Sequence, residues 1–130
     1  MIKFYFPRTI SSISHLYDQN SIKNSLFMLA EEDSKVLAVC QFMYHGEEGR
    51  IQSITDVQGD TSMTIFDGLF RAVMFHMMEM ECKSITITNI PVIMEKYLSI
   101  LGFKKNESGW QHDDFAALLF SGCSSCGENQ

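Results

Sequence analysis

The stretch YLSILGFKK, from Tyr97 to Lys105, carries an apolar helical pattern to its end. The pattern begins at Pro91, stops at Gly102-Phe103, and is followed by two lysines. Glycine suits a helix C-terminus, because it adopts positive φ without steric cost. Phe103 then begins a short new element that can fold back onto the core. What this ending means depends on the elements that come before it in the chain.

The composition is that of one acidic domain. The chain has 130 residues, of which 45% are hydrophobic, and a formal net charge of -6. This charge argues against binding to nucleic acid or to an anionic membrane surface. The sequence has no apolar run long enough for a membrane span and no secretion signal, so we expect a cytoplasmic protein. We expect a single domain over 1–120 and a Gly/Ser/Cys-containing tail over 121–130.

The pattern of apolar residues predicts the order of the elements. Runs rich in β-branched and aromatic residues predict strands at 2–6, 25–32, 35–45, 50–57 and 83–90. Helical spacing predicts a short helix at 11–21, a long one at 63–81 and a third at 91–101. The segment 102–105 is expected as a short strand, 106–109 as a turn, and DFAALLF at 114–120 as the last strand. Together these predict an α/β (α+β) fold. A β-meander is followed by β-α-β-α-β-β in a mixed sheet with helices on both faces.

This order resembles the GNAT fold of the acyl-CoA N-acyltransferases. In that family the last helix commonly ends in a tyrosine-containing turn followed by Gly-Phe, and YLSILGFKK is similar to it. The family's central strand ends in a valine, which Val57 matches, and its long helix opens with two bulky aliphatic residues, which Leu69-Phe70 fit without a gap. The resemblance covers about 26–120 and identifies the chain as a divergent member of the superfamily. It predicts that the strand ending at Val57 and the strand containing Ile85–Ile87 are parallel neighbours that diverge at their C-terminal ends.

The resemblance implies an activity and a co-substrate. The activity is transfer of an acetyl or other acyl group from acyl-CoA to the amine of a small molecule or a peptide. The backbone around Thr55 and Val57 would hold the pantetheine arm by strand-like hydrogen bonds. The start of the long helix would face the diphosphate through Ser62, Met63, Thr64 and Ile65.

The phosphate loop departs from the family's pattern. On this register the glycine-rich loop falls on TSMTIF, 61–66, which contains no glycine, arginine or lysine. A diphosphate needs several converging backbone N–H groups, and glycines allow its close approach because they lack a Cβ atom. We therefore expect weak binding of acetyl-CoA or another acyl-CoA, and we expect no metal.

Two residues are candidates for proton transfer. Asp56 lies near the end of the central strand, where it could accept the amine's proton as a general base or cap the following loop. The family's usual tyrosine protonates the departing thiolate, and its position here is Leu98. Tyr97 is one residue away, about 100° around the helix. It is either a general acid or a half-buried helix residue with its hydroxyl at the surface.

The long helix has a narrow polar face, which points to a contact beyond its own sheet. A second subunit is one interpretation, an acyl or lipid-like ligand is another, and the N-terminal segment 11–19 is a third. The helix residues concerned are Phe70, Met74, Phe75, Met77, Met78 and Met80.

The tail raises a different class of function. Cys123 and Cys126 have the spacing of half a zinc site or of a redox dithiol, whereas a closed zinc site needs four ligands. The sequence thus leaves two alternatives to an acyltransferase. One is a catalytically degenerate domain of the same fold that binds a ligand or partner. The other, with weaker support, is metal or redox sensing through the tail cysteines.

Overall fold

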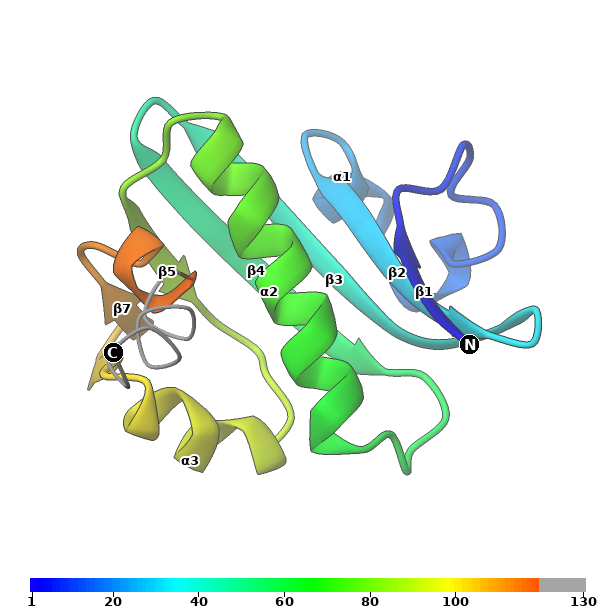
Figure 1. The fold of residues 1–130 in the computed structure, drawn as a ribbon. Helices are drawn as coiled ribbons and strands as arrows, with labels where there is room; N and C mark the ends of the chain where they lie inside the picture. The colour runs from blue at the N-terminus through cyan, green and yellow to red at the C-terminus, as the bar shows by residue number, and fades with distance from the viewer. Residues whose placement is uncertain (120–130) are drawn as a thin grey trace.

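The computed structural model describes residues 1–119. Figure 1 shows a mixed sheet of seven strands in the order β1-β2-β3-β4-β5-β7-β6. The strands are β1 (Ile2–Tyr5), β2 (Leu26–Glu32), β3 (Lys35–His45), β4 (Glu48–Asp56), β5 (Ser84–Ile87), β6 (Lys104–Asn106) and β7 (Gly109–His112). The helices are the 3-10 helix η1 (Ser14–Leu16), α1 (Gln19–Ile22), α2 (Met63–Glu79) and α3 (Ile93–Ile100). The predicted fold class, with its meander and its mixed sheet, is confirmed.

Helices cover both faces of the sheet because β2 and β3 are apolar on both sides. On β2, Met28 and Ala30 pack in the cluster that contains α2, while Phe27 and Leu29 pack with Ile13 on the opposite face. This is the period-two alternation of a strand buried on both sides. In Figure 1 α2 and α3 lie in front of the sheet, and the N-terminal helices lie behind β1–β3.

The last predicted strand is wrong. Residues 116–119 are helical, and the strand that closes the sheet is β7, which pairs with β5 and β6. Alanine and leucine are strong helix formers, and the Ala117 N–H donates to the Asp114 carbonyl at 3.3 Å. Residues 115–119 thus bury one side of a helical turn, with Phe115 fully buried. A strand in the sheet interior would instead have been buried on both sides.

The N-terminal strand, not the segment 11–19, covers part of α2. A Cβ atom on Gly68 of α2 would collide with the Phe4 ring, and Phe6 packs against His76 with ring centroids 4.9 Å apart. The segment 11–19 belongs to the opposite face. Phe75 remains 50% exposed and Met80 44% exposed, so part of α2 still presents apolar surface.

Cys40 and Cys82 are buried free thiols. Cys123 and Cys126, with the prediction of a tail without zinc, lie outside the described residues. Within residues 1–119, no three His, Cys, Asp or Glu side chains are grouped so that they could hold a metal ion. No helix in the same range is both long and apolar enough to cross a bilayer.

Candidate functional site

The candidate site lies where β4 and β5 part. The two strands are parallel neighbours, as predicted, and their register runs from Glu48↔Ser84 to Ile51↔Ile87. β5 then ends, whereas β4 continues to Asp56. The chain after β5 stays close only as far as Asn89, whose carbonyl accepts the Ile54 N–H at 3.0 Å. Beyond Ile54, no strand among residues 1–119 lies next to β4 on this side.

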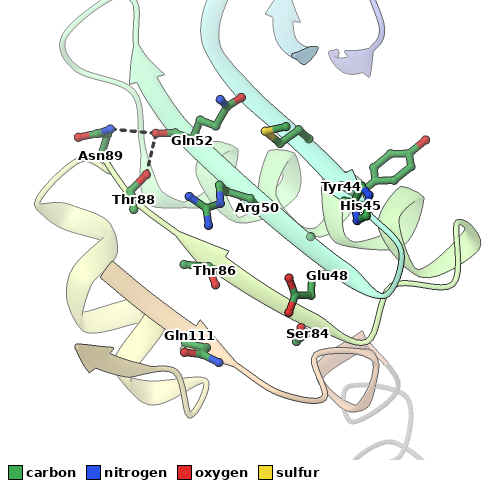
Figure 2. A pocket seen from close by; sticks show the side chains of 12 residues that line it. Tyr44, His45, Glu48, Arg50, Gln52, Ser84, Thr86, Thr88, Asn89 and Gln111 are labelled. Atoms are coloured by element: carbon green, nitrogen blue, oxygen red, sulfur yellow. Dashed lines mark hydrogen bonds between the residues drawn. The ribbon is translucent and has the colours of Figure 1, made fainter. Parts of the chain in front are cut away.

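A β-bulge fixes the place of parting. Gln41 of β3 pairs with Ser53 and Phe42 pairs with Ile51, so Gln52 is the extra residue on β4. Its carbonyl accepts hydrogen bonds from the Thr88 hydroxyl and the Asn89 side-chain amide, both at 3.0 Å (Figure 2). Its side-chain oxygen accepts from the Ser25 hydroxyl at 2.7 Å. The bulge is therefore bound from both sides.

The free edge of β4 presents the N–H of Asp56. The Val57 N–H donates to the Leu37 carbonyl of the β3 side at 3.0 Å, and Thr55 pairs with Val39 of β3. Backbone groups alternate between the two edges of a strand, so the Asp56 N–H points to the edge that β5 has left. The backbone groups of Thr55 and Val57 point to β3. Those of Asp56, which lies between them, point to the opening between β4 and the end of β5.

The Asp56 carboxylate organises the loop that leads into α2. It accepts the Gly59 N–H at 2.9 Å and the Thr61 N–H at 3.3 Å. The Thr61 hydroxyl donates in turn to the Leu37 carbonyl at 3.1 Å. The structure thus places Asp56 in the capping role that the sequence left open beside that of a general base.

We expect Asp56→Ala to lower the free energy of unfolding by about 1–2 kcal/mol, because two loop N–H groups lose their acceptor. Asp56→Asn should lower the free energy of unfolding by less, since the asparagine side-chain oxygen can still accept a hydrogen bond from the loop. Urea unfolding measures both variants, with the exposed Asp60 changed to Ala as the control. Unchanged stability in Asp56→Ala would contradict the capping role.

The start of α2 offers donors but little charge. Ser62 is the N-cap and its side chain makes no capping bond. Its carbonyl accepts from Ile65 and Phe66, so among residues 1–119 the N–H groups of Met63 and Thr64 have no partner. Such groups, with the helix dipole, attract anions. However, the segment 51–70 holds three aspartates and no Lys or Arg.

Tyr97 links α3 to α2. Its hydroxyl donates to the Asp67 carboxylate, which also accepts from Arg71 Nε at 2.8 Å. Its ring packs edge-on against Phe70, with centroids 6.0 Å apart. Burial and the bond to Asp67 raise the pKa of the Tyr97 hydroxyl above its ordinary value of 10.0. Leu98, at the family's usual tyrosine position, is fully buried. The Tyr97 proton is thus directed at Asp67.

We expect Tyr97→Phe to cost about 1 kcal/mol of stability at neutral pH, the value of one hydrogen bond. Because the folded state binds this proton more tightly than the unfolded state, the stabilisation is complete below pH 10.0 and declines as the pH rises above it. Stability measured by denaturant unfolding from neutral to alkaline pH should decline less steeply in the variant. An identical decline in both proteins would contradict the link.

A polar groove of about 750 Å³ opens on the face of the sheet opposite α2 (Figure 2). The orientation follows from β4, where Ile51 is buried on the α2 side and Arg50 and Gln52 face the groove. Its lining consists of Met43, Tyr44, His45, Glu48, Gly49, Arg50, Gln52, Ser84, Thr86, Thr88, Asn89 and Gln111. Because Gln52, Thr88 and Asn89 also mark the parting of the strands, the groove runs up to that point.

The groove residues were not among the site residues predicted from the sequence. The available signal was the alternation of polar residues with isoleucine in RIQSI and SITIT, which puts Arg50, Ser84 and Thr86 on one face. The sequence did not reveal that, within the described residues 1–119, no helix covers that half of the sheet.

No protein-family model matches the sequence, and no curated protein matches it. Several solved structures match the fold. Escherichia coli YhhK bound to coenzyme A has 16% identity and a TM-score of 0.66, over 87% of this chain and 98% of that one. A GNAT family acetyltransferase from Elizabethkingia anophelis with acetyl-CoA bound has 16% identity and a TM-score of 0.66, over 82% of this chain and 78% of that one. The ribosomal-protein-S18-alanine N-acetyltransferase of E. coli has 10% identity and a TM-score of 0.67, over 82% of this chain and 79% of that one.

Proposed function

Because the chain has the GNAT fold, we propose that it is an acyl-CoA-dependent N-acyltransferase that moves an acetyl or other acyl group to an amine. One observation carries the proposal. β4 continues past the end of β5 and runs directly into the loop before α2. The Asp56 N–H on the outer edge of β4 therefore belongs to one continuous segment with the N–H groups at the start of α2, which have no partner in the described part of the chain.

The co-substrate would bind along this segment. The pantetheine arm adds to the free edge of β4 as an extended strand does, with the Asp56 N–H as a donor. The residues around it, Thr55 and Val57, form the adjoining wall. The diphosphate faces the start of α2, at Ser62, Met63, Thr64 and Ile65.

The acceptor would enter from the groove. Its amine nitrogen attacks the thioester carbonyl at the parting of β4 and β5, the carbon–sulfur bond breaks, and the amine loses a proton. Asp56 as base and Tyr97 as acid remain the proposed proton carriers. Both make structural hydrogen bonds in the free chain. We therefore attribute most of the rate to proximity, which can supply several orders of magnitude.

A second candidate is a domain of the same fold that binds a ligand or partner without catalysis. The observations that favour it are the Tyr97 hydroxyl bound to Asp67, and a phosphate loop without glycine or cation. A second copy of the chain on the exposed side chains of Phe75 and Met80 would suit this function. Sensing through Cys123 and Cys126 lies outside the described residues.

The test is to incubate the protein with acetyl-CoA and a panel of small amines and peptide N-termini, and to detect acetylated products by mass. Product masses are preferable to thiol release, because the chain has four cysteines of its own. Acetylated product above the protein-free rate supports the transferase. Binding of coenzyme A without any product supports the non-catalytic domain, and the absence of both contradicts the proposal.

A further inference from the structure

Arg50 occupies the middle of the groove floor. The strand registers align it with Met43 on β3, with Thr86 on β5 and, through Thr86, with Gln111 on β7. Figure 2 shows Arg50 between Gln52 and Glu48 along β4. The guanidinium is exposed, and in residues 1–119 it takes part in none of the ion pairs. A free cation thus faces the cavity.

The groove floor has a chemical order along β4. Gln52 lies at the end where the strands part, Arg50 follows on the same face, and Glu48 comes next. Side chains two residues apart on one strand face are separated by about 6.7 Å. A ligand that lies along the groove therefore meets amide and hydroxyl groups first, then a cation, and then an acid.

Given the proposed acyl transfer, we propose that the acceptor is a short amino acid whose carboxylate is bound by Arg50. The planar guanidinium pairs with a carboxylate through two parallel hydrogen bonds, and Thr86, the register partner of Arg50 on β5, also lines the groove. The amine then reaches the parting of the strands, about 6.7 Å away. Glu48 lies only two residues from Arg50 on the same face of β4, and the chain has a net charge of -6. Both repel anions, so they favour a singly charged carboxylate over a phosphate.

The order of groups also orients the acceptor. Glu48 repels a carboxylate and attracts an ammonium group, so a reversed ligand would place its amine at the far end of the groove from the thioester. The Gln111 amide group is held in place, because its nitrogen donates one hydrogen bond to Asp113 at 3.0 Å and its oxygen accepts from Asn106 at 3.2 Å. It is uncharged, so its contact with a carboxylate is weaker than that of Arg50.

The experiment uses matched pairs of ligands and the full chain. Glycine, β-alanine and γ-aminobutyrate, each beside its carboxamide, are titrated into the isotope-labelled protein while the Arg50 and Thr86 signals are followed. We expect at least one acid to bind and its carboxamide to bind about tenfold to a hundredfold more weakly, the value of a charge-assisted contact. Arg50→Gln should remove this preference and Arg50→Lys should restore part of it. The control is Lys104→Gln, which changes an exposed cation on β6 outside the cavity lining and should keep the preference.

Four results would overturn the inference. The first two are equal binding of acids and carboxamides, and a preference that survives Arg50→Gln. The other two are tighter binding of inorganic phosphate than of any acid, and lack of binding by every acid. Coenzyme A is titrated in separate samples. If it fails to bind while the carboxylate preference is present, the transferase proposal fails and the assignment of Arg50 stands.

Discussion

We expect coenzyme A to bind this chain with a dissociation constant nearer millimolar than micromolar, and Ser62→Gly with Thr64→Gly to tighten it by about tenfold or more. The start of α2 keeps its dipole, and two of its N–H groups have no partner within residues 1–119. Cβ atoms at Ser62, Met63 and Thr64 hold a diphosphate away from these donors, and no cation is present nearby in the sequence. Loss of two or three charge-assisted bonds, each about 1.5–3 kcal/mol, weakens binding by a few orders of magnitude.

The matched control is Ser62→Ala with Thr64→Ala, which removes both hydroxyls and keeps both Cβ atoms. It should bind coenzyme A no more tightly than the wild type. Ser62 makes no capping bond, so its change to glycine costs little stability. Thr64→Gly costs only about 0.3–0.5 kcal/mol of helix stability, because threonine is itself a weak helix former. Thermal unfolding checks each variant before calorimetric titration. Micromolar binding by the wild type would show that this loop holds phosphate by another geometry.

We expect Gly109→Ala to lower the free energy of unfolding by about 3 kcal/mol or more. Gly109 begins β7 with a φ of +127°, and a Cβ atom there would collide with the backbone carbonyl oxygen of Ile87 and lie 2.8 Å from Thr88 Cγ2. A backbone atom in a paired strand cannot move aside cheaply. The change should also displace Thr88, which binds the Gln52 carbonyl at the end of the groove.

The control for this prediction is Gly46→Ala. Gly46 also has positive φ, +60°, but a Cβ atom added there meets nothing within 4 Å. Gly46→Ala should therefore lower the free energy of unfolding by only about 1 kcal/mol. Urea unfolding separates the two variants, and equal losses would contradict the close approach at Gly109.

Much of the fold was predictable because its central elements have strong local signals. The meander strands and α2 have clear periodicity, and Gly102 ends α3 as expected, with a φ of +97°. The end of the sheet was not predictable in this way. The strand GWQH is short and has no apolar alternation. DFAALLF resembles a strand, but its residues 116–119 are helical, with Phe115 buried and Ala117 exposed. Tertiary packing decided both segments.

The candidate site was predictable only in position. The valine at the end of the central strand placed the gap correctly beside β4, but the bulge at Gln52 and the alternation of backbone groups decide which N–H faces it. Asp56 was a candidate base because of where it lies, and only the three-dimensional structure shows its bonds to Gly59 and Thr61. The alternation in RIQSI puts Arg50 on the polar face of its strand, but only the three-dimensional structure shows that a groove lies over that face.

The most direct test of acyl-CoA binding at the free edge of β4 is an amide-resolved NMR titration of the full chain with acetyl-CoA. We predict that the signals of the Asp56, Met63 and Thr64 N–H groups shift together and saturate at one concentration, while those of η1 and α1 stay in place. Shifts confined to other parts of the chain, or none at millimolar acetyl-CoA, would contradict the proposal that this segment binds the co-substrate.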